Sequence, residues 1–362
     1  MTRSPIAPER SLPVESLVGN GRPEWLLRSS RPPISLPIDR RTVLVGVVVI
    51  ILVLVIGAYT LTAGAAHTPL TDVVSALFGN ADRRTEMLVI EWRLPRLLFA
   101  ICCGVGLGMS GAIFQSLTRN PLGSPDVIGF AAGSYTGALI VMLVVGSAGY
   151  YAVAAGSLVG GMLTAALVYL LAYRDGVDGF RLIIIGIGIS AVLGSINSYL
   201  MLQADLEDAM SAAAWGAGSL NGLGFDQFWP MLTVLALLMP FTVALGPGMR
   251  ELELGDDTAK ALGTSVEKLR LAAVVLGVAL TALVTAAAGP ISFIALAAPQ
   301  IARRLTGAPG IGLMPAALVG ALLLVGADAV AIAIQLPVGI VTVSIGGAYL
   351  LWLLIREYRR RR

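Results

Sequence analysis

Long apolar runs separated by short polar segments account for most of this chain. Because an α-helix rises about 1.5 Å per residue, roughly 20 apolar residues are needed to cross the hydrocarbon core of a bilayer. Ten runs approach that length, although the eighth is short and contains Pro299, so we expect it to be irregular or partly re-entrant. The pattern therefore predicts an all-α polytopic membrane protein with ten transmembrane helices. The expected spans are residues 43–63, 94–117, 127–146, 150–172, 181–203, 227–248, 270–289, 291–305, 313–332 and 336–355.

The composition supports this class. Hydrophobic residues make up 56% of the 362 positions and charged residues only 13%, whereas soluble domains have about 25% charged residues. A soluble chain of this length could not hide so much apolar surface from water, which excludes an ordinary soluble enzyme. One histidine and two adjacent cysteines, Cys102 and Cys103, provide neither a disulfide framework nor a Cys/His metal cluster. We therefore expect no metal and no cofactor in this chain.

The distribution of positive charge predicts the orientation. With ten spans and an inside N-terminus, only four of the 25 Lys and Arg residues lie outside, namely Arg83, Arg84, Arg93 and Arg96. Excess Lys and Arg mark the cytoplasmic side of a membrane protein. We therefore expect a multi-pass protein of the cytoplasmic (plasma) membrane with both termini in the cytoplasm.

Three regions follow from this topology. Residues 1–41 contain seven Arg and seven Pro and lack the apolar region of a signal peptide, so we expect a disordered cytoplasmic tail. Residues 42–357 form the transmembrane domain, within which residues 249–270 make the longest cytoplasmic loop. Residues 358–362 form a basic cytoplasmic C-terminus.

Glycines and a lone carboxylate stand out within the spans. Residues 104–111 contain a G-x-G-x-x-G sequence, but no strand precedes it, so a dinucleotide site is disfavoured. Gly104 and Gly108 instead share one helical face and predict close helix packing, as do the pairs at 133/137 and 156/160. Asp328, near the outer end of span nine, is the clearest intramembrane carboxylate, and we interpret it as an interhelical hydrogen-bonding group. The scarcity of such carboxylates argues against ion-coupled transport.

The loop at 249–270 predicts a short helix outside the bilayer. Asp256, Asp257 and Thr258 supply an N-terminal cap and favourable charge, and Gly263 supplies a stop. Such a helix suits docking to a cytosolic partner, although a solvated loop helix is the alternative. The chain has no G-x-x-x-x-G-K-[ST] sequence, so any nucleotide must be bound by another chain.

Several motifs occur in order along the chain. They are Arg-Leu-Pro-Arg at 93–96, Ser-Gly-Ala-Ile-Phe-Gln at 110–115, Arg-Asn-Pro-Leu-Gly-Ser-Pro at 119–125, and the segments 254–263, 289–303 and 336–342. Together these motifs resemble the iron-siderophore and vitamin B12 permeases of ABC importers, the FecCD-like family. The resemblance covers residues 43–357, and residues 180–188 and 215–222 look closest to the ferric enterobactin permease branch.

The resemblance implies a non-catalytic permease subunit that moves a ferric siderophore. It implies a like permease subunit, a distinct sister chain in this branch, around a central pathway. It also implies two cytoplasmic ATPases that bind ATP and Mg²⁺, and an extracytoplasmic siderophore-binding protein. Nucleic acid has no part in such a system.

The same resemblance assigns roles to residues, with the alternative that the outer arginines only extend to the membrane surface. Docking of the binding protein is assigned to Arg93 and Arg96; ATPase coupling to Leu254, Gly255, Asp256, Asp257, Ala259, Leu262 and Gly263; and the cytoplasmic gate to Asn120 and Leu122, with a second gate position at Gly179 and Phe180.

The sequence also departs from the family pattern. Gln300 follows Pro299 where the family commonly has His, and the segment from Asp328 to Leu336 is short and holds no Arg. The tail before residue 42 lies outside the resemblance. A short, inexact repeat relates residues 111–121 to residues 289–299 at opposite faces, as in inverted-repeat transporters.

Other functions stay open at this point. A vitamin B12 or haem permease of the same fold is the first alternative, and an ion-coupled secondary transporter is the second. An intramembrane enzyme is the third, although the chain lacks a His/Cys/Glu constellation for it.

Overall fold

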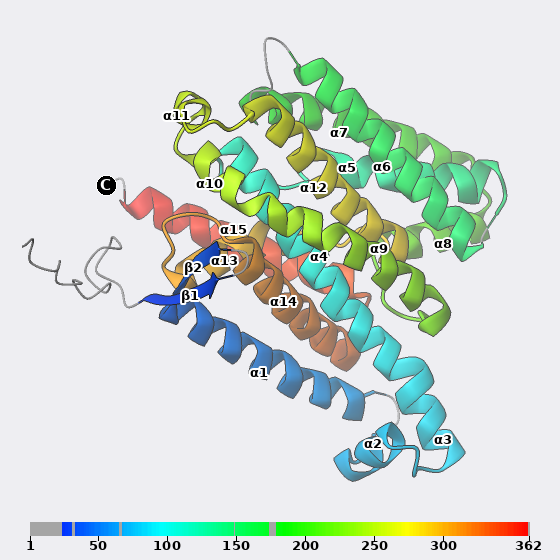
Figure 1. Ribbon diagram of the computed structural model, residues 1–362. Helices are drawn as coiled ribbons and strands as arrows, with labels where there is room; N and C mark the ends of the chain where they lie inside the picture. The colour runs from blue at the N-terminus through cyan, green and yellow to red at the C-terminus, as the bar shows by residue number, and fades with distance from the viewer. Residues whose placement is uncertain (1–23, 31–32, 65–66, 148, 174–178, 361–362) are drawn as a thin grey trace, which may run out of the picture.

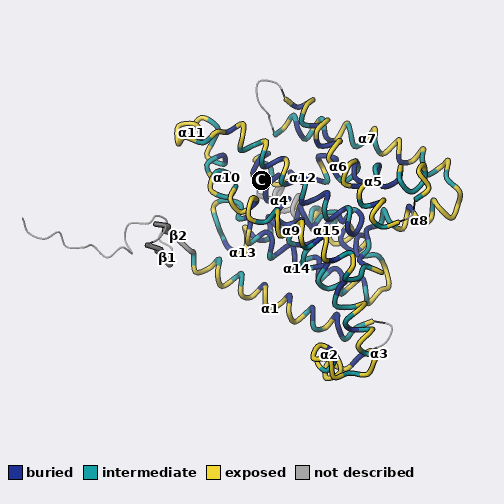
Figure 2. The backbone as a smooth tube through the Cα atoms, turned by 45° about the vertical axis from the view of Figure 1, so that its right-hand side comes forward, coloured by how far each residue is buried: buried dark blue, intermediate teal, exposed yellow. Residues whose placement is uncertain are grey.

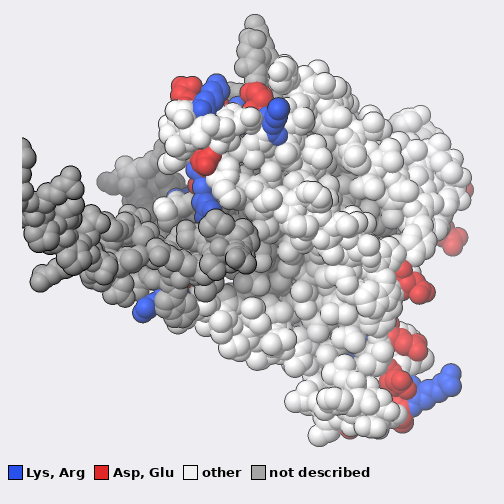
Figure 3. Space-filling view, viewed as in Figure 1, with Lys and Arg blue, Asp and Glu red and all other residues white. Residues whose placement is uncertain are grey.

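Apolar helices lie side by side and make up most of the molecule (Figure 1). The computed structural model describes residues 24–30, 33–64, 67–147, 149–173 and 179–360. On the face shown in Figure 3, a broad uncharged surface separates the end that carries α11 from the end that carries α2 and α3. Such a belt is the surface expected of helices embedded in lipid.

The described helices are α1 (Arg40–Thr62), α2 (Leu70–Leu77), α3 (Arg83–Glu86), the π-helical η2 (Met87–Arg93), α4 (Leu94–Thr118), α5 (Phe130–Leu139), the π-helical η3 (Ile140–Val144), α6 (Tyr150–Ala172), α7 (Gly179–Gln203), α8 (Leu206–Gly216), α9 (Phe225–Ala244), α10 (Gly246–Glu253), α11 (Asp256–Ala261), α12 (Val266–Ala288), α13 (Ile294–Thr306), α14 (Leu313–Ile334) and α15 (Val338–Arg360).

The helical membrane fold predicted from the sequence is confirmed. Among the described residues, seven helices are long and apolar enough to cross a bilayer: α1, the continuous α3–α4 helix, α6, α7, α9, α12 and α14. The other three expected spans correspond to shorter helical elements, two of which are apolar. Two are the helices at Phe130–Val144 and Val338–Leu351. The third is α13, whose 13 residues extend only about 20 Å, in agreement with the irregular eighth span.

Helix α4 occupies the centre of the bundle, where buried positions are concentrated (Figure 2). Its glycines allow α14 to approach closely, because a Cβ atom on Gly104 would lie 2.5 Å from the carbonyl oxygen of Gly320. A Cβ on Gly108 would overlap the carbonyl of Ala316 in the same way. The predicted packing role of these glycines is therefore confirmed.

The N-terminal region differs from the expected disordered tail. Strands β1 (Glu24–Ser30) and β2 (Pro33–Asp39) form an antiparallel pair in which Trp25 opposes Ile38. The local composition did not reveal this pairing. Residues 1–23 lie outside the described residues, as do residues 361–362 of the expected C-terminal segment.

The first and last helices share one end of the molecule. The start of α1, the end of α15 and the short helix α11 lie toward the same end, whereas α2 and α3 lie at the opposite end (Figure 1). We call these the α11 end and the α2 end. The chain therefore crosses the membrane an even number of times from the start of α1 to the end of α15, if the two ends lie on opposite sides of the bilayer.

Candidate functional site

The predicted gate residues lie in a turn at the end of α4. Arg119 ends this helix in the left-handed region with φ of 48°, and Pro121 prevents its continuation. The backbone N–H of Leu122 donates to Oδ1 of Asn120 over 2.9 Å, and that of Gly123 donates to the Asn120 carbonyl over 2.9 Å. These bonds make residues 120–122, which we call the gate turn, a defined structure with Leu122 37% exposed.

The structure brings the second predicted gate position to the first. A Cβ on Gly179 would lie 2.6 Å from the Cα of Thr118, so the start of α7 contacts the end of α4 at a point where only glycine fits. Phe180, the next residue, is 70% exposed. The two gate segments are therefore adjacent within one chain, and their gating role stays a prediction.

The chain turns back into the bundle after the gate turn. Ser124 and Pro125 are buried, and Oδ2 of Asp126 accepts a hydrogen bond of 3.3 Å from the backbone N–H of Phe293. Phe293 precedes α13 with φ of 71°, so Asp126 meets the start of that short helix. Sequence reasoning missed Asp126, because it directly precedes the expected third span; the helix there begins only at Phe130.

A buried pair of amides accounts for Gln300. The Gln115 amide nitrogen donates to the carbonyl of Leu296 over 2.9 Å, and the Gln300 amide donates to Oε1 of Gln115. Pro299 lies inside α13 and cannot donate a backbone hydrogen bond, and the Gln115 amide adds a donor from α4 to the same turn of that helix. Gln300 therefore joins α13 to α4 through Gln115.

A cavity of about 250 Å³ lies beside the gate turn at the α11 end. Its lining combines the gate turn with α13 and with the segment that joins α13 to α14. The lining includes Gln115, Asn120, Pro121, Glu253, Gln300 and Gly310. The space shows that the turn is not packed on all sides within this chain.

The predicted coupling segment forms α11, which protrudes at its end of the molecule (Figure 1). Gly255 and Gly263 flank it with φ of 114° and 91°, values that favour glycine. Ala259 is fully buried against Leu252 and Val266, and its coupling role stays a prediction. The flanking leucines point the other way, with Leu254 66% exposed and Leu262 60% exposed. Asp257 is also exposed.

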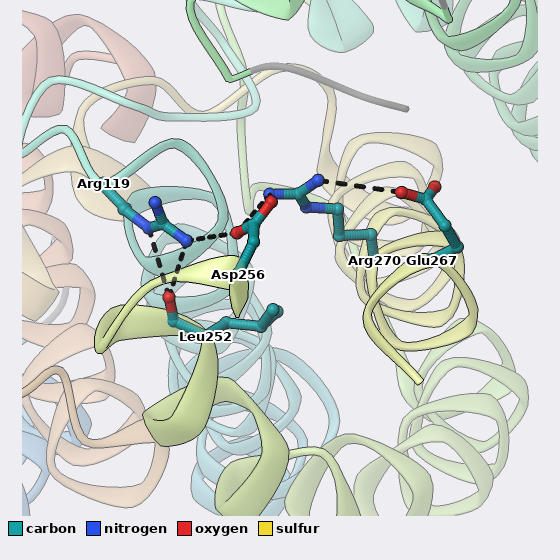
Figure 4. A network of polar contacts seen from close by, with 5 residues as sticks. All are labelled: Arg119, Leu252, Asp256, Glu267 and Arg270. Atoms are coloured by element: carbon teal, nitrogen blue, oxygen red, sulfur yellow. Dashed lines mark hydrogen bonds and ion pairs between the residues drawn. The ribbon is translucent and has the colours of Figure 1, made fainter. Parts of the chain in front are cut away.

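Asp256 joins three elements through ion pairs (Figure 4). Its carboxylate accepts hydrogen bonds from Arg119 and from Arg270, the latter over 2.7 and 2.8 Å. Arg119 also donates to the carbonyl of Leu252 over 2.8 and 3.2 Å, and Arg270 lies 3.9 Å from Glu267. Burial acts to raise the pKa of Asp256, but Arg270 and Arg119 outweigh it and lower this pKa below the usual 3.8. Asp256 is therefore held within the chain by Arg119 and Arg270, and its coupling role stays a prediction.

The predicted docking arginines at the α2 end have internal partners. Arg93 donates to the carbonyl of Leu61 over 2.7 Å and to the hydroxyl of Thr68 over 3.0 Å. Arg96 forms a forked pair with Asp328, with N–O distances from 2.8 to 3.1 Å, and also donates to Asn221. The interpretation of Asp328 as an interhelical hydrogen-bonding group is thus confirmed.

A cavity of about 790 Å³ opens beside these arginines. Its lining carries both signs of charge, with Glu91 and Asp226 as well as Arg93, Arg96 and Asp328. A partner that docks at this cavity would contact both positively and negatively charged side chains. The docking role of the two arginines stays a prediction.

Known proteins resemble this chain over almost its whole length. The family model of the FecCD transport family matches residues 41–356. The chain is 50% identical to the ferric enterobactin transport system permease protein FepG of Escherichia coli (strain K12), over 90% of this chain and 99% of that protein. It is 34% identical to the iron(3+)-hydroxamate import system permease protein FhuG of Bacillus subtilis (strain 168), over 87% and 98%.

A solved structure agrees with this similarity. A metal-chelate type ABC transporter in an inward-facing conformation matches with a TM-score of 0.76 and 27% identity. The match covers 87% of this chain and 99% of that chain.

Proposed function

This chain belongs to the FecCD transport family, and on that premise we propose that it is the permease subunit of an ATP-driven importer that moves ferric siderophores across the cytoplasmic membrane. The observation that carries the proposal is the 50% identity to FepG, which extends over 99% of that permease. FepG is named for ferric enterobactin and FhuG for iron(3+)-hydroxamate. A ferric chelate is common to both names.

In this proposal the energy comes from other chains. The sequence contains no phosphate-binding G-x-x-x-x-G-K-[ST] loop, so ATP and Mg²⁺ would be held by two separate ATPase subunits. We assign their contact to the exposed side of α11, where Leu254 and Leu262 offer apolar side chains and Asp257 a charge. The α11 end, with the start of α1 and the end of α15, would then face the cytoplasm.

The remaining partners fit other surfaces. Little of α7 is buried within the chain, and Ile184 and Ile187 are exposed along it, so this helix has surface for a like permease subunit. The siderophore-binding protein would dock at the α2 end, beside the cavity that contains Arg93 and Arg96. Arginine suits such an interface because its planar fork binds carboxylates and amides from a partner.

Transport itself requires only conformational change of this chain. ATP binding to the partners would displace α11, and the helices would move between outward-open and inward-open arrangements. The gate turn lies at the α11 end of the central helix α4, where Leu122 and Asn120 would close the pathway with the equivalent turn of the second subunit.

Uptake of radioiron complexes by a strain that lacks this chain tests the proposal. The panel contains ferric enterobactin, a ferric hydroxamate, ferric citrate and labelled vitamin B12. We expect restoration of the chain to restore uptake of at least one ferric siderophore and to leave vitamin B12 uptake unchanged. Restoration of vitamin B12 uptake alone, or of none of the four compounds, would contradict the proposal.

A further inference from the structure

Arg119 has an unusual backbone conformation at the end of α4. It is the residue between the last turn of α4 and the gate turn, and its φ of 48° lies where glycine is the usual residue at a helix end. An L-residue other than glycine is strained in this conformation, and such strain persists where the surrounding contacts determine it. The side chain of Arg119 therefore has contacts that compensate for an unfavourable backbone.

Those contacts lie on α10 and α11. The guanidinium donates twice to the Leu252 carbonyl in the last turn of α10 and once to the Asp256 carboxylate in the first turn of α11 (Figure 4). A cation is favourable at the carbonyl end of α10, and a forked guanidinium can bind both acceptors at once. The Arg119 side chain thus joins the residue before Asn120 to both α10 and α11.

The far side of α11 is held as well. Asp256 also binds Arg270 in the first part of α12, and Ala259 is buried between α10 and α12. A displacement of α11 therefore acts on Arg119 as well as on α12. The cavity of about 250 Å³ beside the gate turn leaves room for the turn to follow that displacement.

Stability alone does not account for the Arg119–Asp256 pair. The side chains of Arg119 and Asp256 are 44% and 33% exposed, and exposed ion pairs contribute little to folding. The bonds of Arg119 can still fix the orientation of α11 relative to the end of α4, because the guanidinium binds two acceptors in one geometry. The network is placed to transmit movement between two segments that are far apart in the sequence.

We infer that Arg119 is a positioning residue that couples the displacement of α11 to the gate turn through its bonds to Leu252 and Asp256. This inference rests on the proposed function and assigns Asp256 a role inside the chain in place of a contact with the ATPase. Loss of the link uncouples ATP hydrolysis from transport. The complex still assembles and hydrolyses ATP, but the gate turn no longer follows α11.

The test uses the complete complex of both permease subunits, ATPases and binding protein in liposomes. The measured quantity is the number of ATP molecules hydrolysed for each ferric enterobactin complex accumulated. Accumulation by the unsubstituted complex tests the proposed function separately, since its absence there would refute that function before any variant is compared. If another ferric siderophore is the one taken up by cells, that complex replaces ferric enterobactin.

Arg119→Gly is the first variant, because glycine suits the left-handed backbone and retains the end of α4. We expect the ATP cost of each accumulated complex to rise about tenfold or more, the change expected when hydrogen bonds to a charged group are lost. A second pair of variants, Arg119→Gln and Arg250→Gln, makes the same substitution at two arginines, and Arg250→Gln is the matched control. Arg250 is exposed on α10, so its loss removes a similar cation from the same region and should not change the ratio.

A double variant tests whether the two residues act as a unit. Asp256→Asn should raise the ratio in the presence of Arg119 but should have little further effect in the Arg119→Gly background. Independent effects of the two substitutions would overturn the inference. An unchanged ratio of ATP hydrolysed to complex accumulated in Arg119→Gly would also overturn it. A parallel loss of assembled complex, ATP hydrolysis and uptake would overturn it as well, because that is the result expected of a purely structural role.

Discussion

The ion pair between Arg96 and Asp328 offers a quantitative test of how the α2 end is held together. The pair joins α4 to α14 through a fork with N–O distances of 2.8, 3.0 and 3.1 Å. The Asp328 side chain is 3% exposed and that of Arg96 is 20% exposed. Arg96→Gln therefore leaves a carboxylate that has almost no access to water.

The expected loss of stability follows from that burial. Removal of one member of a buried ion pair costs about 3–5 kcal/mol, because the remaining charge is left uncompensated. The new Gln amide can return one neutral hydrogen bond of about 1 kcal/mol, so we expect a net loss of roughly 2–4 kcal/mol. Asp328→Asn leaves a partly exposed cation that still has Asn221, and we expect it to cost about 1–3 kcal/mol.

Thermal unfolding of the purified chain in detergent measures these changes. At roughly 2 °C per kcal/mol for a large chain, Arg96→Gln should lower the midpoint by about 4–8 °C. The double variant Arg96→Gln/Asp328→Asn should recover about 2 kcal/mol relative to the sum of the single losses, since no buried charge remains. Arg84→Gln, which removes an exposed arginine from the same end, should change stability by less than about 0.5 kcal/mol.

Strict additivity of the two single losses would refute this reasoning. It would mean that Arg96 and Asp328 do not stabilise each other. An Arg96→Gln midpoint equal to that of Arg84→Gln would refute it equally, because the cost of the stranded carboxylate would then be absent.

Three further predictions concern other parts of the chain. Gly108→Val should lower the free energy of unfolding by about 1–3 kcal/mol, because a Cβ at this position overlaps the Ala316 carbonyl. Gly326→Val should be tolerated, because a Cβ there meets no atom within 4 Å. Equal losses of stability in the two variants would be inconsistent with close packing of α4 on α14. Leu122→Gly should speed the leak of a small dye from liposomes that contain the assembled complex, and a leak equal to that of the unsubstituted complex would remove Leu122 from the gate. Because the pKa of folded Asp256 lies below its usual 3.8, its contribution to stability is present above that value and lost as the pH falls through the lower folded value. The stability difference between the unsubstituted chain and Asp256→Asn should therefore narrow below about pH 4, and a constant difference from pH 7 to pH 3 would argue against this titration.

The parts of the fold that the sequence predicts are those encoded by local pattern. The apolar runs locate the helices, because the cost of exposing polar backbone in lipid applies to each run separately. Four-residue spacing in the pair Gly104 and Gly108 likewise places both residues on one face, whichever helix packs there. The short helix α11 follows from its own charges and glycines.

The contacts of the charged residues could not be predicted in the same way. Arg96 and Asp328 are separated by 232 positions, and Arg119 and Asp256 by 137 positions. A pattern of a few residues contains no information on which distant helix supplies a partner. The ion pairs of Arg96 and Arg119 could therefore not be predicted from the sequence. Asp126 was missed for a related reason, since its place at the start of α13 depends on the chain turning back after residue 122.

Accumulation of radioiron-labelled ferric enterobactin, or of the siderophore selected by the uptake panel, in liposomes that contain the complete complex tests whether this chain is the permease of an ATP-driven ferric siderophore importer. We expect accumulation above the outside concentration when ATP is supplied to the α11 end. We expect no accumulation with a non-hydrolysable ATP analogue or with an imposed proton or sodium gradient alone. Accumulation driven by such a gradient without ATP would exclude an ATP-driven permease and would identify an ion-coupled carrier instead.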